Sequence, residues 1–279
     1  MNHRPNFRRF SAMLASAIAV AAVATPTVAQ DLPTSQPPML LITREQVKVG
    51  RDADHAKIEA GWPAAYTKAK FPDYYIAITS ITGQPQAWFI APFASNAAVG
   101  ESLERQSADA TLDTELARLS KADAEVLDGL NVIQARARPE LSQGAFPDMV
   151  SRRYYAITVI QMRPGRGDAL DSILKITNAA ATRAGVSNSF RVYQIVAGMP
   201  SPTFLVFTTA ASMAEFDVNA ANGMKVNAAL TAEEQAALLK YRTDGIASTV
   251  TQRFRINPAM SYVSAATREK DPKFWGLKK

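Results

Sequence analysis

An internal repeat constrains this chain more than any other feature of its sequence. The segment Gly50-Arg51-Asp52-Ala53 is followed 115 residues later by the similar segment Gly165-Arg166-Gly167-Asp168. The pair Asp128-Gly129 returns after 116 residues as Asp244-Gly245. Few residues are identical, but the turn residues come in the same order in both halves. A repeat of this length indicates that one supersecondary unit occurs twice.

Each half is predicted to follow the order strand, helix, strand, strand, helix, strand. Runs rich in β-branched and aromatic residues indicate the strands, and capping residues followed by helical spacing indicate the helices. The first half is predicted to have strands at 40–49, 74–81, 86–93 and 131–138, with helices at 52–70 and 95–127. The second half is predicted to have strands at 154–163, 191–196, 203–209 and 249–256, with helices at 168–184 and 213–241. We expect the helices to break at Pro63, near 107–110 and near Asn222.

Two βαββαβ units give two four-stranded antiparallel sheets, each with helices on one face. The bare face of each sheet needs cover, and the simplest cover is the other sheet. The predicted fold is therefore α+β, with the two sheets packed as an intramolecular barrel and the helices outside. The predicted organisation is a signal peptide at 1–29, a leader at 30–38, repeats at 39–144 and 145–260, and a C-terminal tail at 261–279.

The first 29 residues have the three parts of a secretory signal. Arg4, Arg8 and Arg9 form a basic start, residues 12–24 form an apolar run, and Thr27-Val28-Ala29 supplies small residues before the cut. A run of this length is too short to cross about 30 Å of hydrocarbon as a helix. We therefore expect a periplasmic or secreted bacterial protein whose mature chain has no membrane span.

The composition excludes several classes of site. The chain has no cysteine, which excludes disulfides, thiolate metal sites and a cysteine nucleophile. Its net charge of +6 includes three signal arginines, and residues 268–279 hold five basic against two acidic residues. The remaining body is near neutral, so no nucleic-acid partner is expected. The basic tail is interpreted as a solvated end, with the alternative that Tyr262, Phe274 and Trp275 lay it across the body.

This layout resembles the dimeric α/β-barrel superfamily of ferredoxin-like domains. Its members include cofactor-independent monooxygenases of antibiotic biosynthesis, NIPSNAP-like proteins and, in fused form, chlorite dismutase and its haem relatives. The resemblance covers about 39–260 and depends on the element order and the repeat. It implies two tandem ferredoxin-like repeats that form in one chain what other members form as a dimer. A monomer or a weak homo-oligomer is therefore expected.

His55 is the only histidine of the predicted mature chain and the weak candidate for a catalytic base. Asp52, one helical turn earlier, would orient it, while the alternative is a solvated side chain at the start of a helix. The haem relatives bind iron through a histidine in the later repeat, and this sequence has none after His55. No metal site and no cofactor are predicted.

Polar residues at matching strand positions of the two halves form the predicted ligand pocket. If the apolar sides of the sheets face the helices, these residues point into the space between the sheets. A structural network that joins the two sheets is the alternative, because buried amides need partners. The residues of this predicted pocket are Arg44, Gln46, Thr79, Gln134, Gln161, Gln194 and Gln252.

Two functions remain open from the sequence. One is the binding of a small apolar molecule between the sheets, or a purely structural role. The alternative, implied by the resemblance, is a cofactor-independent monooxygenase-like enzyme that acts on a small aromatic molecule. His55 or the glutamine and arginine set would then accept protons and stabilise an oxyanion.

Overall fold

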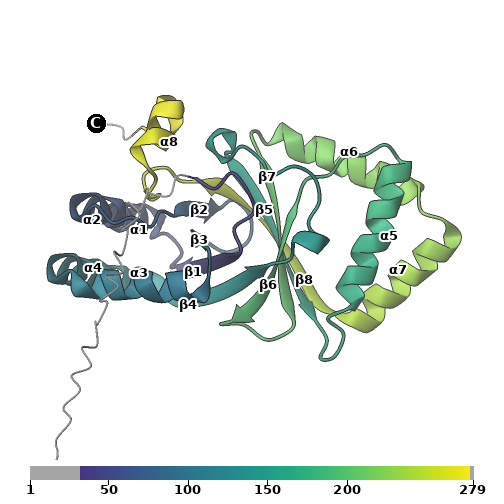
Figure 1. Cartoon of the computed structure of the whole chain (residues 1–279), viewed down its shortest axis with the longest axis horizontal. Coiled ribbons are helices and arrows are strands. Elements are labelled where there is room, and N and C mark those ends of the chain that lie inside the picture. The colour runs from purple at the N-terminus through teal and green to yellow at the C-terminus, as the bar shows by residue number, and fades with distance from the viewer. Residues whose placement is uncertain (1–31, 277–279) are drawn as a thin grey trace, which may run out of the picture.

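A computed structural model describes residues 32–276, and the predicted signal peptide and its cut site lie outside that range. Eight strands form one closed antiparallel barrel, with α1–α4 on one side and α5–α7 on the other (Figure 1). The strands are β1 Met39–Val47, β2 Ile76–Ser80, β3 Gln86–Phe93, β4 Leu127–Ala137, β5 Tyr154–Met162, β6 Arg191–Ala197, β7 Thr203–Ala210 and β8 Ile246–Ile256. The helices are α1 Asp52–Glu59, α2 Gly61–Ala69, α3 Asn96–Ala108, α4 Ala110–Ala124, α5 Ala169–Arg183, α6 Ala214–Ala228, α7 Ala232–Gly245, α8 Ala265–Lys270 and α9 Pro272–Trp275.

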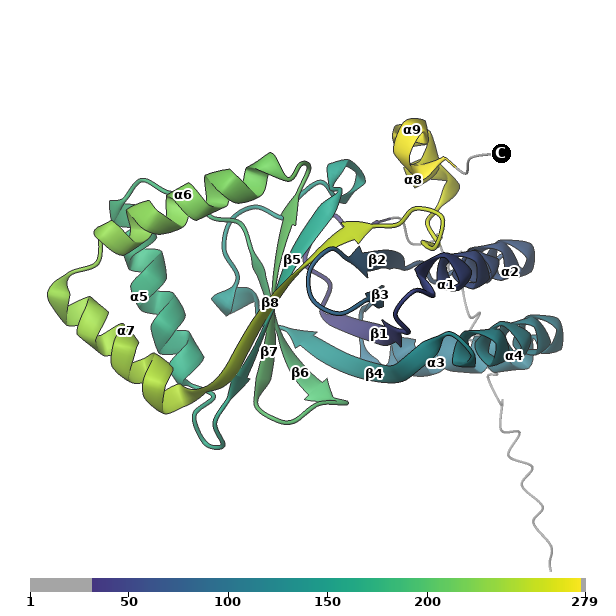
Figure 2. The ribbon, with the colours of Figure 1, turned by 180° about the vertical axis from the view of Figure 1, so that it is seen from behind.

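The order of strands around the barrel is β1-β3-β2-β8-β5-β7-β6-β4. Each half contributes four neighbouring strands, and the joins between the halves are β2 with β8 and β4 with β6. Figure 2 shows β8 crossing the molecule to reach β2. The prediction of a closed α+β barrel with outer helices is confirmed. The barrel is one continuous hydrogen-bonded ring rather than two separate sheets stacked face to face.

Apolar side chains from all eight strands fill the barrel interior. Alternate residues of a strand point to opposite faces. In every strand, the buried apolar residues that point inward belong to a single cluster. Trp88 and Phe254, from opposite halves, meet there with ring centroids 5.3 Å apart. An eight-stranded barrel has an interior that side chains can fill. The space between the halves is therefore mainly packed core.

Several element boundaries differ from those predicted. The helix expected over 52–70 is divided at Ala60, so Pro63 lies in the first turn of α2, where its missing N–H breaks no intrahelical bond. The break expected near Asn222 is wrong: α6 continues through Gly223, because one glycine costs only about 1 kcal/mol. The predicted helix end at Asp128-Gly129 lies inside β4, which pairs with β1 there.

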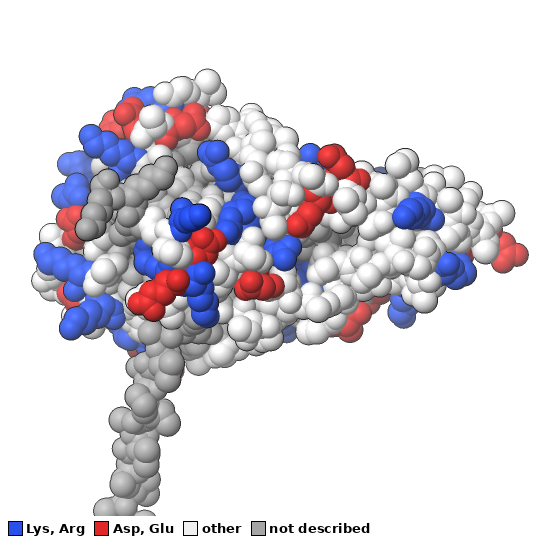
Figure 3. Space-filling view, turned by 90° about the horizontal axis from the view of Figure 1, so that it is seen from above, with Lys and Arg blue, Asp and Glu red and all other residues white. Residues whose placement is uncertain are grey.

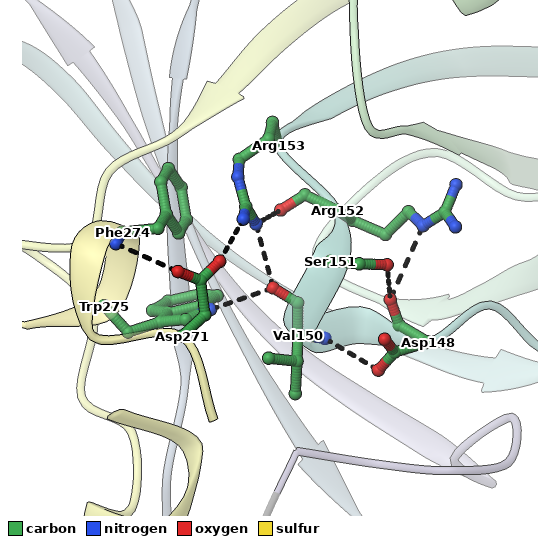
Figure 4. Close-up of polar contacts among 8 residues, drawn as sticks. All are labelled: Asp148, Val150, Ser151, Arg152, Arg153, Asp271, Phe274 and Trp275. Atoms are coloured by element: carbon green, nitrogen blue, oxygen red, sulfur yellow. Dashed lines mark hydrogen bonds and ion pairs between the residues drawn. The ribbon is translucent and has the colours of Figure 1, made fainter. Parts of the chain in front are cut away.

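The C-terminal segment packs against the body and is not a solvated end over its described part. Trp275 is fully buried, and its indole Nε1 donates a hydrogen bond to the Val150 carbonyl at 3.1 Å. The Arg153 guanidinium pairs with Asp271 and stacks over the Phe274 ring, with Cζ 3.9 Å from the ring centroid (Figure 4). This arrangement confirms the alternative in which aromatic residues hold the tail across the body.

No helix within residues 32–276 is long and apolar enough to cross a membrane. On the face in Figure 3, basic and acidic side chains are interspersed.

Candidate functional site

Three ionisable side chains meet between β1 and α1, on the helix side of the first half. Glu45 points outward from β1, because its neighbours in the strand face the barrel interior. His55 and Glu59 lie one turn apart on α1 and therefore share one helix face. The residues are only 5%, 2% and 2% exposed, respectively. The local sequence thus buries three polar groups at one point.

The geometry of this cluster leaves carboxylate oxygens available. His55 Nε2 lies 2.8 Å from Glu45 Oε2. Asp123, at the end of α4, accepts a hydrogen bond from the Trp62 indole at 3.2 Å. Glu59 Oε1 and Asp123 Oδ1 are buried, and neither has a hydrogen-bond partner among the described residues. Unpaired buried carboxylate oxygens are costly, so they need an explanation in a native structure.

Burial dominates the electrostatics of the cluster. It raises the pKa of Glu59 to about 11, and the charges of Glu45 and Asp123 act in the same direction. Burial also raises the pKa of Glu45, against the opposing hydrogen bond and charge of His55. Burial thus disfavours the charged form of both carboxyl groups.

A cavity of about 310 Å³ opens beside the cluster, between the outer face of the first-half strands and α1–α3. Glu45 and Glu59 contribute to its wall, whereas His55 lies behind Glu45. Most of the wall is apolar, and its aromatic residues are Trp62, Tyr66, Phe71, Tyr75, Phe89 and Phe93. A concave aromatic chamber with a few polar groups at one end is the usual form of a small-molecule site.

The second half has no such cluster at the equivalent positions. The strand pairing shifts at Gln46/Val47 in β1 and at Gln161/Met162 in β5. These matching shifts show that equivalent residues of β1 and β5 are 115 positions apart in the sequence. On that alignment Glu45, His55 and Glu59 correspond to Ile160, Leu170 and Leu174, which pack in one hydrophobic cluster. The fold therefore does not require charge at these positions. The second-half residues also do not fit a histidine-ligated haem.

Four residues of the predicted pocket, Arg44, Gln46, Gln161 and Gln252, are on the inward-facing side of their strands. They lie toward one end of the barrel. Arg44 stacks over Trp88, with its Cζ 4.4 Å from the ring centroid, and donates to Met199 Sδ at 3.3 Å. Gln46 donates to Gln84 Oε1 at 2.6 Å, and Gln161 accepts from Ser248 at 3.4 Å. Gln252 follows the parity of Phe254. Of these contacts, the one between Arg44 and Met199 joins the two halves, whereas Gln46 and Gln161 bond to residues of their own halves.

The other three residues point to the outer side, contrary to the prediction. Thr79 lies two residues after Ala77 and therefore faces the same side of β2. Ala77 packs with Ala87 and Met260 on the outer side of the strands. Gln134 donates to Asn96 Oδ1 at 2.8 Å, and Gln194 accepts from Arg138 at 2.9 Å. None of the seven predicted pocket residues lines the 310 Å³ cavity.

The sequence comparison matched Gln134 with Gln252 as equivalent residues of the last strand in each half, and the structure shows that this match is wrong by one residue. Gln134 pairs with Leu41 in β1, and the residue in the same place of the second half is Arg253, which pairs with Ala156. The spacing between halves is therefore 119 residues at the last strand. A shift of one residue moves a side chain to the opposite face.

The predicted partner of His55 is also wrong, because Asp52 is exposed and Glu45 contacts the imidazole. Glu45, Glu59 and Asp123 were not predicted as site residues. Comparing the halves at the 115-residue spacing could have found two of them, because Glu45 and Glu59 stand where the second half has Ile160 and Leu174.

A small cavity of about 80 Å³, lined in part by Tyr74, Tyr155 and Phe207, lies at the end of the barrel opposite to Gln46 and Gln161. It is much smaller than the cavity beside Glu45 and Glu59, and sites for drug-sized ligands are usually larger than this. The cavity inside the barrel is therefore the smaller of these two.

Comparison with known proteins finds likeness at the level of structure. No family model and no curated protein matches the chain. An anthrone oxidase-like protein matches 82% of this chain and 94% of its own, at 11% identity and a TM-score of 0.54. A "putative monooxygenase" from Fusobacterium nucleatum subsp. nucleatum matches 79% of this chain and 92% of its own, at 10% identity and a TM-score of 0.50.

The chain has the dimeric α/β-barrel fold. Chlorite dismutase from Candidatus Nitrospira defluvii also matches, over 85% of this chain and 96% of its own, at 10% identity and a TM-score of 0.45. At these identities the likeness establishes the barrel fold alone, since proteins of one fold perform many functions.

Proposed function

We propose that this protein is an enzyme that acts on a small aromatic molecule bound in the first-half cavity. The observation that carries the proposal is an aromatic chamber whose wall includes two buried acidic side chains, Glu45 and Glu59. Aromatic walls would hold the ring of the substrate, and a carboxylate would accept the hydrogen bond or the proton of its hydroxyl group. The names of the anthrone oxidase-like and Fusobacterium proteins agree with this class of activity.

His55 has a positioning role in this proposal. Its imidazole holds Glu45 at 2.8 Å from behind and does not line the cavity. Removing a proton from a phenol or enol leaves an electron-rich ring. In the cofactor-independent monooxygenases that the sequence resembles, such aromatic substrates supply their own electrons. Molecular oxygen would be the second substrate and the oxidant. One of its atoms would become a ring carbonyl of a quinone product, and the other would leave as water with the hydrogen of the attacked ring carbon and the hydroxyl proton that the base took up.

Glu45→Gln tests the carboxylate end of the cavity. We expect it to lower the turnover of phenolic substrates by about 10²–10⁴-fold, the usual contribution of a general base. Oxygen uptake with a panel of phenols and anthrones measures the rate. The control is Glu104→Gln on the exposed surface of α3, which should leave turnover unchanged. Equal rates in the wild type and Glu45→Gln would exclude Glu45 as the base.

Binding can be tested without turnover by filling the chamber. Ala91 lies in the cavity wall, so Ala91→Trp should abolish the thermal stabilisation produced by 1-naphthol. In the wild type this stabilisation should reach about 2.7 kcal/mol at a ligand concentration 100 times Kd. Val49→Trp, at a residue that is 87% exposed, is the matched control. Equal stabilisation of both variants would place the aromatic ligand elsewhere.

We also propose that the protein is exported and that its two halves derive from a tandem duplication. The shared element order and the matching register irregularities of β1 and β5 support the duplication. The signal pattern of residues 1–29 supports export. The intact mass of the protein from a periplasmic fraction should correspond to a chain that begins at Gln30.

A further inference from the structure

We propose that Glu45, His55 and Glu59 bind one divalent first-row transition-metal ion at the polar end of the cavity. This inference shares its location with the proposed function and deepens it, but its evidence comes from the polar atoms and not from the aromatic walls. One imidazole nitrogen and two carboxylate oxygens are ligands that Mn²⁺, Fe²⁺, Co²⁺ and Zn²⁺ accept in proteins.

The distances suit a single ion. One potential ligand atom from each of the three residues lies within 4.8 Å of the other two. Two ligand atoms on one ion, each about 2.1 Å away, are at most about 4.2 Å apart. Neighbouring ligands of a tetrahedral ion are about 3.4 Å apart, so side-chain movements of roughly 1 Å would bring the set around one ion. His55 Nε2 and Glu45 Oε2 are already 2.8 Å apart, a separation typical of neighbouring ligands.

The charge of the cluster also points to a cation. Glu45, Glu59 and Asp123 are all at least 95% buried. Among residues 32–276, His55 is the one basic side chain within ion-pair distance of any of them. Isolated buried carboxylates are strongly disfavoured unless a partner or a metal compensates them. A divalent ion would compensate two of these charges.

Glu59 supplies a second, independent observation. Its Oε1 is buried without a hydrogen-bond partner among the described residues, and the side chain belongs to the group within 4.8 Å. Asp123 lies beside Glu59 and accepts the Trp62 hydrogen bond, so its negative charge would add to the attraction for a cation. Groups beside a metal ligand commonly affect metal affinity.

The cluster is also open on one side, as a reactive metal site must be. Glu45 and Glu59 line the cavity, so a small molecule could approach the remaining coordination positions. The second half shows that packing alone does not explain these residues. Ile160, Leu170 and Leu174 fill the same positions with apolar side chains. No metal site was predicted from the sequence, because it lacks the histidine and cysteine combinations that usually bind zinc. The sequence does not show that carboxylates of β1 and α1 meet beside His55.

Metal titration of the tag-free mature protein tests the inference. The protein is first treated with EDTA and then titrated with Mn²⁺, followed by electron paramagnetic resonance, and separately with Co²⁺, followed by visible absorption. We expect one ion per chain. Glu59→Gln and His55→Leu should each weaken binding by more than about 100-fold, and Asp123→Asn by about 10–100-fold. Glu104→Gln should bind as the wild type does.

A variant that copies the second half keeps the test independent of folding problems. Glu45→Ile, His55→Leu and Glu59→Leu, combined with Asp123→Asn, should give a folded protein that binds no ion. If the folded wild type takes up neither metal between pH 6 and 8, or if this variant binds as tightly as the wild type, the inference is wrong. Binding of 1-naphthol by the EDTA-treated protein is measured in parallel, so failure of the metal site and failure of the aromatic site are distinguishable.

Discussion

Replacing Trp88 with alanine should lower the free energy of unfolding by about 3–5 kcal/mol, the usual cost of truncating a buried aromatic side chain. Trp88 is fully buried in the barrel interior. Its ring packs on Phe254 of the opposite half and under the Arg44 guanidinium, and its Nε1 donates to Gln86 at 3.0 Å. Truncation would leave a cavity between the halves and remove the ring beneath a half-buried cation.

Urea denaturation measured by circular dichroism gives the free energy of unfolding for this comparison. Val49→Ala is the control, because Val49 is 87% exposed and should change stability by less than about 0.5 kcal/mol. A loss below about 1 kcal/mol in Trp88→Ala would mean that the barrel interior is not the packed core described here.

Trp275→Ala should destabilise the protein by a similar amount, about 3–5 kcal/mol. The indole is fully buried although it lies four residues from the end of the sequence, and it donates to the Val150 carbonyl. The Arg153–Asp271 pair and the Phe274 ring beside it are held by the same short segment (Figure 4). That ion pair is partly exposed and contributes less than the indole.

Lys273→Ala is the matched control within the same turn, because Lys273 is exposed. Thermal unfolding of the two variants, followed by calorimetry, should show a lower Tm for Trp275→Ala alone. If both variants melt with the wild type, the C-terminal segment does not contribute to the stability of the body.

The sequence allowed the order of the elements to be predicted, because strands and turns depend on local patterns. Runs such as the one in β5 are β-rich, and Gly50 and Gly165 adopt positive φ at matching turns. Side-chain direction was less predictable. The spacing between the halves changes from 115 residues at β1 to 119 at β4, and a single-residue error at Gln134 reverses the face.

The candidate site could not be assembled from sequence because its members come from separate elements. Glu45 lies on β1, His55 and Glu59 on α1, and Asp123 on α4. Within α1 the sequence offers Asp52 as the partner of His55, because the two residues are one helical turn apart, but Asp52 is exposed. Only the packing of α1 against the outer side of β1 brings Glu45 to the imidazole.

The joins of β2 with β8 and of β4 with β6 affect how the chain can fold during synthesis. The last strand, β8, ends at Ile256, so β2 has no second neighbour until nearly the whole polypeptide has left the ribosome. Until then the first half would expose an open strand edge and the apolar face that carries Ile42, Trp88 and Ile133. A nascent or truncated first half should therefore be prone to aggregate and to depend on chaperones, and the barrel would close only after β8 has been synthesised.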